Sequence, residues 1–252
     1  MKPARSSVCL FVFRLLLCAL GLAAGMLRAE EPRADLPIPA MRELAPGVFE
    51  IGSMRLDKNA GTLTLPGKVN MDNGALEYLI CTAKGPTHES LLVTEVQPSD
   101  VHFGMLLLGA KGAGILTPAP SDAPPAQIDA EYLRRAPKLK GDNLTITARW
   151  KKAGMEHGAP VEDWIVAQNT GKPAPRGPWI YTGSMFAEDK FLAQFEGLIA
   201  ALVTNPSALI NNPRSGNDDD KIWMANTKAV PPADTHIEIV IKLEVKPEKK
   251  PK

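Results

Sequence analysis

The chain has 252 residues, of which 44% are hydrophobic, and its formal net charge is +1. This length is enough to bury a substantial core in one large domain or two small ones. The near-neutral charge comes without a basic stripe, which excludes an electrostatic footprint for DNA or RNA.

The N-terminus has the pattern of a secretory signal. Lys2 and Arg5 precede an apolar run from Val8 to Leu27. An arginine interrupts this run, so no continuous apolar segment reaches the roughly 20 residues that span a bilayer. We expect cleavage after Ala29, which makes residues 1–29 a signal peptide and the protein periplasmic or extracellular. The alternative is an uncleaved N-terminal anchor, which would be its one contact with a membrane.

Removal of residues 1–29 changes the charge balance and the cysteine count of the chain. It takes away four basic residues and no acidic ones, so 25 Lys and Arg face 28 Asp and Glu. It also takes Cys9 and Cys18 and leaves Cys81 alone. A single thiol can form neither an internal disulfide nor an iron–sulfur cluster, so we expect stability to come from the core.

The mature chain starts with a flexible lead-in and a β-meander. Residues 30–46 are rich in charge and proline without a period. Strand-like runs follow at Val48 to Ile51, Met54 to Leu56 and Thr62 to Met71, separated by turn residues. In the third run apolar and polar residues alternate, which predicts one buried and one solvated face.

Two further segments, Leu76 to Ala83 and His88 to Glu95, flank a four-residue connection that contains glycine and proline. A connection of this length is typical of a β-hairpin, so we expect antiparallel pairing. In a regular register Cys81 lies opposite Ser90, and His88 shares their face.

A helix is predicted next, over about Ser99 to Leu108. Ser99 is a plausible N-cap, and Gly109 is placed to end the helix. Lys111 to Lys140 is rich in proline, and we interpret it as a long loop excursion rather than a domain junction.

The second half of the chain contains strands with less regular connections. The predicted elements are a strand at Leu144 to Lys151, a short helix at Pro160 to Gln168, a strand at Trp179 to Ser184, a hairpin or helix within Phe191 to Val203, with the hairpin favoured, and a strand at His236 to Val245. Together these elements predict a single α+β domain over residues 47–246. Its mostly antiparallel sheet would carry the Ser99 to Leu108 helix, and residues 247–252 would form a charged, disordered tail.

Several short motifs, in this order, resemble the YdjY-like domain family of exported bacterial proteins. They are His88-Glu89-Ser90, Val101-His102, Leu106 to Gly109, Trp179-x-Tyr181-Thr182-Gly183-Ser184, the asparagine–proline segments and the aspartate-bearing loop before Trp223. The resemblance implies an exported domain of uncharacterised function. Some members are described as ferredoxin-like, but Cys81 alone cannot supply the thiolates of a cluster, so no iron–sulfur cofactor is expected.

A thiol–imidazole pair is the first candidate chemistry. In the predicted hairpin Cys81 lies diagonal to His88, and an imidazole at that distance could activate a thiol. The alternative, which we favour, is that Cys81 is a small buried hydrophobic residue.

A metal site is the second candidate. His88 and His102 have suitable donor atoms for zinc or a similar ion, with Glu89 as a further ligand, although Glu89 points to the other face of the hairpin. Their spacing matches no diagnostic pattern, and local hydrogen bonding explains both histidines equally well. Asp218 and Asp220 could bind calcium, or form a solvated acidic turn.

A ligand groove is the third candidate. Trp179, Tyr181 and Ser184 could line a groove for a sugar or a peptide, with Cys81, His88 and Ser90 on the hairpin face nearby. The alternation of Trp179 and Tyr181 is also typical of the core face of a strand.

The sequence therefore predicts an exported cell-envelope binding or interaction module. Its partner would be a small molecule, a glycan or a protein. The alternative from another class is a metal-dependent enzyme centred on His88 and His102. The two other histidines carry no predicted role, because His157 is expected in a loop and His236 on the solvated face of its strand.

Overall fold

The structure is a computed structural model that describes residue 36 and residues 38–115, 139–187 and 189–244. The predicted signal peptide, most of the proline-rich excursion and the charged tail lie outside these residues. Within the described part, no helix has the length and apolar character required to cross a bilayer.

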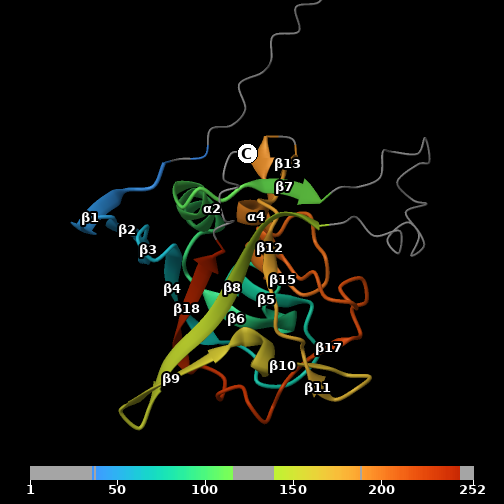
Figure 1. The fold of residues 1–252 in the computed structure, drawn as a ribbon. Helices are drawn as coiled ribbons and strands as arrows, with labels where there is room; N and C mark the ends of the chain where they lie inside the picture. Colours follow the sequence, from blue (N-terminus) through green and yellow to red (C-terminus); the bar gives the residue numbers. More distant parts are fainter. Residues whose placement is uncertain (1–35, 37, 116–138, 188, 245–252) are drawn as a thin grey trace, which may run out of the picture. The chain divides into compact units, whose positions relative to one another are not determined.

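Eight strands close into a barrel (Figure 1). In ring order they are β4 (Thr62–Val69), β18 (His236–Leu243), β8 (Leu139–Lys152), β12 (Trp179–Tyr181), β16 (Ile210–Asn211), β15 (Leu198–Ala201), β5 (Tyr78–Thr82) and β6 (Ser90–Thr94). The ring closes because β6 pairs with β4. Neighbours are antiparallel except for the pairs β15–β16 and β5–β6, which are parallel.

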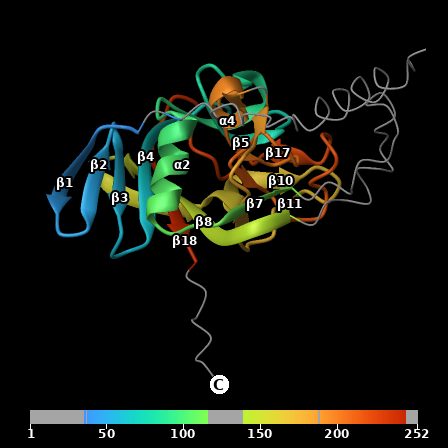
Figure 2. The same ribbon diagram turned by 90° about the horizontal axis from the view of Figure 1, so that it is seen from above.

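A meander extends the sheet beyond β4. The strands β1 (Met41–Ala45), β2 (Val48–Ile51) and β3 (Met54–Asp57) pair in sequence order, and Figure 2 shows them to one side of the ring. The predicted meander is confirmed, and its first strand lies within the predicted lead-in. All five residues of β1 are exposed, as expected for an edge strand.

Smaller elements decorate the barrel. They are η1 (Thr87–Glu89), β7 (Gly112–Ile115), β9 (Met155–Pro160), η3 (Val161–Trp164), a three-stranded sheet of β11 (Lys172–Pro173), β10 (Ile165–Ala167) and β17 (Trp223–Ala225), a hairpin of β13 (Phe186–Ala187) and β14 (Lys190–Phe191), and α4 (Leu192–Glu196). Of these, β9 pairs with one end of β8.

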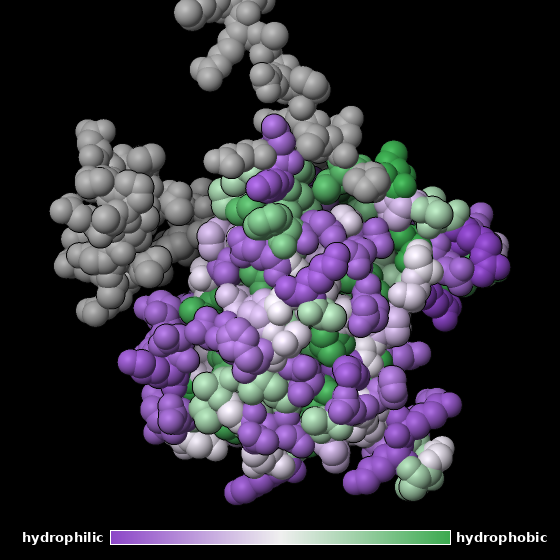
Figure 3. Space-filling view, turned by 180° about the vertical axis from the view of Figure 1, so that it is seen from behind, coloured by the Kyte–Doolittle hydropathy of each residue, from purple (hydrophilic) through white to green (hydrophobic). Residues whose placement is uncertain are grey.

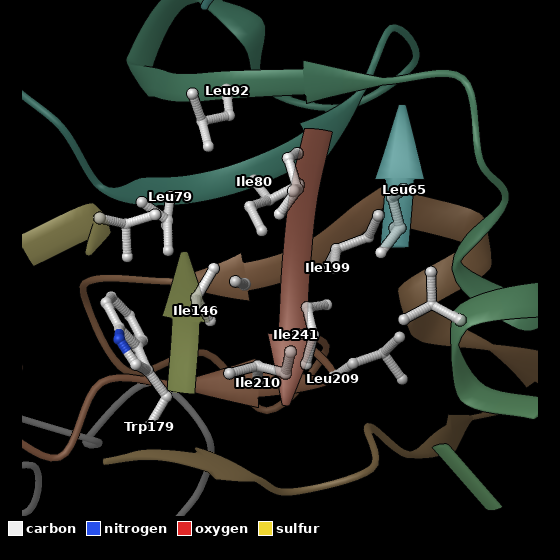
Figure 4. Close-up of a cluster of buried hydrophobic side chains, with 14 of the residues drawn as sticks. Leu65, Leu79, Ile80, Leu92, Ile146, Trp179, Ile199, Leu209, Ile210 and Ile241 are labelled. Atoms are coloured by element: carbon white, nitrogen blue, oxygen red, sulfur yellow. The ribbon is translucent and has the colours of Figure 1, made fainter. Parts of the chain in front are cut away.

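The core fills the interior of the barrel. Alternate residues of β18 point inward, and Ile237, Ile239, Ile241 and Leu243 are buried as the alternation predicts. Figure 4 shows side chains from several strands of the ring, including those of Ile146 on β8, Ile80 on β5 and Ile241 on β18, gathered in one buried cluster. On the face seen in Figure 3 hydrophilic residues cover most of the described surface.

The one long helix of the described part, α2 (Pro98–Leu107), lies across one end of the barrel. It contacts both β4 and β15, which belong to different sides of the ring. Gly104 allows this close packing, because a Cβ at that position would lie 2.9 Å from Leu63 Cδ2. The helix therefore closes an end of the barrel.

The predicted α+β fold is wrong. The structure is mostly β, and the helix over about Ser99 to Leu108 does not cover the face of an open sheet. The reason is that β4 pairs with β18 on one side and with β6 on the other, and this second pairing closes the sheet into a ring. Alternation along a strand specifies a buried face but does not distinguish an open sheet from a closed one.

The helix also begins differently from the prediction. Its N-cap is Gln97, whose side chain makes no capping bond, and Pro98 occupies the first turn, where an N–H donor is not needed. Ser99 lies inside the helix and is not the cap. Gly109 ends the helix as predicted, with φ of 85°.

The predicted hairpin of Leu76 to Ala83 and His88 to Glu95 is also wrong, because β5 and β6 are parallel. Tyr78 pairs with Ser90 and Cys81 with Val93. The turn η1 carries the chain back to the start of β5, and the Asn70 amide fixes it by donating to the carbonyl oxygens of Thr87 and Ser90 at 2.6 and 2.7 Å.

Two further segments differ from their predictions. Within Phe191 to Val203 the chain forms α4 and then β15 instead of a hairpin, and Gly197 makes the break with φ of 71°. Within Pro160 to Gln168 a single turn of η3 is followed by strand β10. In both cases a short helical turn leads directly into a strand that joins a sheet.

Candidate functional site

A groove opens at the end of the barrel opposite α2. Strand β8 pairs with β18 as far as Trp150 and with β9 as far as Lys152. Beyond Trp150 the β8–β9 hairpin continues through a tight turn in which Ala153 and Gly154 have positive φ angles of 51° and 79°. Figure 1 shows this hairpin projecting from the barrel.

The segment before β18 leaves in another direction, toward β4. Val69 donates its N–H to the Thr235 carbonyl at 3.0 Å and accepts the N–H of Asp234 at 2.8 Å. The Lys68 ammonium binds the Asp234 carboxylate at 2.6 Å, and this hydrogen bond lowers the pKa of Asp234. These contacts hold the segment away from the hairpin, and the space between them is the groove.

The groove has a volume of about 800 Å³. This lies within the usual range of ligand pockets, roughly 300–1,000 Å³. Its lining comes from the end of β8, the start of β9 and the start of β18: Arg149, Trp150, Lys151, Glu156, His157, Asp234, Thr235, His236, Ile237 and Glu238.

Aromatic rings form one wall of the groove. The His157 ring stacks on the half-buried Trp150 indole, with centroids 5.4 Å apart and an interplanar angle of 21°. Trp150 in turn meets the buried Trp164 edge to face at 5.2 Å, which fixes its orientation. His157 Nε2 is buried and has no hydrogen-bond partner among the described residues. A buried polar atom in this state costs about 1–3 kcal/mol.

The charged side chains of the groove are mixed in sign. Arg149 and Glu238 are paired in register across β8 and β18, yet the described residues give neither of them a hydrogen bond or an ion pair. Lys151 and Glu156 approach each other to 4.0 Å, at the limit of an ion pair. The groove therefore offers donors and acceptors that are not committed to partners in the described part of the chain.

Cys81 and Ser90, predicted on the hairpin face, are both fully buried. Burial raises the pKa of the Cys81 thiol, which opposes formation of a thiolate, and a hydrogen bond with Ser90 offsets part of this shift. The predicted neighbour of the thiol, His88, is 79% exposed and lies 3.7 Å from Glu89. The parallel pairing of β5 and β6 replaces the register on which the thiol–imidazole pair was based.

Three predicted metal ligands lie near one another, together with a residue that the sequence did not single out. The pKa of Glu77 is raised by burial, then by the nearby carboxylates of Glu89 and Asp220, and lowered by His88. Asp218 is exposed in the same loop as Asp220. Within the described residues, no three His, Cys, Asp or Glu side chains are placed to share a metal ion.

The other predicted ligand, His102, has different surroundings. Its Nδ1 lies 2.7 Å from the hydroxyl of Tyr181, and its ring packs 4.9 Å from that of Phe191. Burial lowers the pKa of His102 and raises that of Tyr181, so both groups are neutral near pH 7. This contact links α2 to β12 and leaves the Tyr181 ring fully buried.

The remaining groove candidates of the sequence, Trp179 and Ser184, are engaged within the fold. Trp179 donates its indole N–H to Glu162, which forms a buried ion pair with Arg214 at 2.6 Å. The Ser184 hydroxyl donates to the carbonyl of Ser207 and accepts the N–H of Ala193.

The groove residues themselves were missed as a site. Trp150 was not singled out, His157 was expected in a loop and His236 on a solvated face. The available signal was Lys152-Ala153-Gly154 directly after an alternating strand, a turn that can reverse the chain into a returning strand.

Comparison with known proteins gives a family. The model of the YdjY domain matches residues 54–242, about three quarters of the chain and all eight strands of the barrel except the last residue of β18. The chain belongs to the YdjY domain family. This confirms the resemblance, and the groove residues of this YdjY domain all lie inside the matched range. Neither the curated proteins nor the solved structures contain a match.

Proposed function

We propose that this YdjY domain is a binding module of the cell envelope and that the groove between the β8–β9 hairpin and β18 is its ligand site. The observation that carries the proposal is the stacked Trp150–His157 wall, in which a buried imidazole nitrogen lacks a partner among the described residues. Buried polar atoms without a partner are uncommon in folded proteins, which distinguishes this wall from the rest of the described core.

The surroundings of the wall support the same function. An open aromatic surface with a few uncommitted polar groups is the usual composition of a small-molecule site. Arg149 and Glu238 line the same pocket from the solvent-facing side of β8 and β18, where the described residues give them no partner. The other residues predicted to bind ligand are buried or bonded within the fold, apart from His88.

The envelope location is the second part of the proposal. It is supported by the basic start, apolar run and small residue before the expected cleavage site in residues 1–29. The alternative of a metal-dependent enzyme centred on His88 and His102 gains no supporting contact among the described residues, since the two imidazoles have different neighbours.

The four tryptophans of the chain make a direct test possible. Trp164, Trp179 and Trp223 are at most 1% exposed, whereas Trp150 is half-buried in the groove. In a ¹⁵N-labelled sample each indole N–H gives its own NMR signal, and Trp150→Phe identifies the one that belongs to the groove.

The probes are indole, benzoate, glucosamine and N-acetylglucosamine, each titrated separately. We expect at least one of them to shift the Trp150 signal and to leave the three buried indoles unchanged. If none shifts Trp150, or if all four signals move together, the groove is not a ligand site and the proposal is overturned.

A further inference from the structure

We infer that the free edge of β9 pairs with the same edge of a second copy of this chain. Strand β9 is hydrogen-bonded on one side to β8, and the described residues place no strand on its other side. Two features carry this inference, the backbone groups of the edge and the charges beside it. The dimer would form whether or not the groove binds a ligand.

The backbone groups that face outward from β9 follow from the turn before it. This two-residue turn has positive φ angles of 51° and 79°, as in a type I′ hairpin. Met155 therefore forms a hydrogen-bonded pair with β8, and so does His157, because such pairs alternate along an antiparallel ladder. Glu156 and Gly158 direct their N–H and C=O groups away from β8. None of these groups has a hydrogen-bond partner among the described residues.

A two-fold axis perpendicular to the sheet brings the free groups of two copies together. In the antiparallel register centred on His157, Glu156 of one copy lies opposite Gly158 of the other, and the two residues exchange N–H···O=C bonds. Each copy then donates two bonds and accepts two. Pro160, the last residue of β9, lies opposite Gly154 of the turn in this register. Because proline has no N–H, the pairing ends where the donors end.

The charges beside the edge complement one another in the same register. Arg149 is the cross-strand neighbour of Gly158, and a Cβ on that glycine would lie 3.9 Å from Arg149 Cγ. No side chain therefore separates the arginine from the edge, and its guanidinium has no partner among the described residues. Glu156 is 85% exposed and approaches Lys151 only to 4.0 Å.

The second copy supplies the missing partner of the arginine. Its Glu156 lies opposite Gly158 on the face that carries Arg149, and it extends over the bare glycine toward the guanidinium. The two-fold axis repeats this contact, so the pairing forms two ion pairs. A side chain at position 158 would stand between the two charges.

The opposite face of the hairpin adds apolar contact. Met155, which is 64% exposed in one copy, lies opposite Ala159 of the other. The two His157 residues face each other there, each stacked on its own Trp150. An interface of this size is typical of a weak dimer, whose population depends on protein concentration.

Self-association is measured by sedimentation equilibrium and by amide hydrogen exchange of the ¹⁵N-labelled protein, between about 10 µM and 1 mM. We expect a monomer–dimer equilibrium in which the amides of Glu156 and Gly158 exchange more slowly as the dimer forms. The amide of His157, already bonded to β8, should change less. A monomer at every concentration overturns the inference, and so does a dimer that leaves the Glu156 and Gly158 amides unchanged.

Charge reversal tests the register. Arg149→Glu and Glu156→Arg each turn two attractions into two repulsions, so each variant alone should dimerise about tenfold more weakly than the parent protein. In a heterodimer of the two variants every carboxylate again meets an arginine. An equal mixture should therefore dimerise nearly as tightly as the parent protein does, a recovery that misfolded variants would not show.

The matched control is Lys242→Glu, which makes the same change of charge as Arg149→Glu at an exposed residue of β18, away from β9. It should dimerise as the parent protein does, and circular dichroism verifies the fold of each variant. Equal dimerisation by Arg149→Glu and the parent protein, or no recovery in the mixture, overturns the inference. These results leave the ligand titration of Trp150 unaffected, so the proposed function is tested separately.

Discussion

The two ends of the barrel differ in how their polar groups are satisfied. At the helix end, α2 lies across the strands, His102 bonds Tyr181 at 2.7 Å, and the side chains of Gln97 and Gln194 bond each other at the same distance. At the hairpin end no α-helix of the described residues covers the strands, and only the short turn η3 packs there, through Trp164 on Trp150. There His157 Nε2 is buried without a partner, and Arg149 stands at the groove rim with none among the described residues.

This difference indicates a division of roles. Buried groups that bond one another contribute to stability and have nothing left to offer a ligand. Groups that lack partners cost stability and gain it back when a ligand supplies the missing bonds. The closed end of this YdjY domain therefore stabilises the barrel, and the open end carries the proposed site.

The largest expected contrast is in packing. Leu63 is fully buried beneath Gly104 of α2, whereas Met155 is 64% exposed in the β8–β9 hairpin. Leu63→Ala should lower the free energy of unfolding by about 2–5 kcal/mol, because it leaves a cavity in the core. Met155→Ala should change it by less than about 0.5 kcal/mol. Urea unfolding measures both, and similar losses would contradict the division of roles.

A smaller contrast concerns the bond between α2 and β12. Tyr181→Phe removes the hydroxyl that meets His102 and keeps the buried ring. We expect the free energy of unfolding to fall by about 0.5–1.5 kcal/mol. An unchanged midpoint in urea would mean that the His102–Tyr181 contact does not stabilise the closed end.

The same contact gives a dependence on pH. Because burial lowers the pKa of His102 below its ordinary 6.5, the unfolded chain takes up a proton at a higher pH than the folded protein does. The stability that this histidine contributes is present above pH 6.5 and is lost as the pH falls toward the folded-state pKa. Between pH 8 and pH 5 the parent protein should therefore lose more stability than His102→Gln. Asp100, which also has a raised pKa from burial, is common to both proteins, so its effect cancels in the comparison.

The smallest expected effect is at the open end. His157→Phe keeps a ring on Trp150 and removes the unpartnered nitrogen. Replacing such a group by an apolar one of similar shape is close to neutral or stabilising, so the free energy of unfolding should change by less than about 0.5 kcal/mol or rise. If His157→Phe lowers the free energy of unfolding as much as Tyr181→Phe does, His157 is as well hydrogen-bonded as Tyr181. The proposed difference between the two ends would then be wrong.

The parts of the fold that depend on local patterns could be predicted. Alternation located β4 and β18 and assigned their buried faces, since a strand with one face in the core must alternate. The ring could not be predicted in this way. The pairing of β5 with β6 and the closure by β4 and β6 are set by which strands meet in space, and the short connection through η1 is equally compatible with a hairpin.

The candidate site was harder to predict because it arises from a divergence of strands. Trp150 has the sequence context of any inward-facing residue of β8, and only the departure of β18 toward Val69 exposes it to a groove. The residues that attracted attention by type, such as Cys81 and Trp179, were instead used inside the fold. Chemical type alone did not separate reactive groups from structural ones.

The position of β18 in the ring has a consequence for how the protein is made. It is the last strand of the described residues, yet it inserts between β4 and β8. Until β18 has been synthesised, the edges of β4 and β8 that face it stay unpaired, and the ring cannot close. Contacts so distant in sequence form slowly, and exposed edges invite pairing with other chains. Synthesis of β18 is therefore the step that allows an open sheet with exposed edges to become a closed barrel.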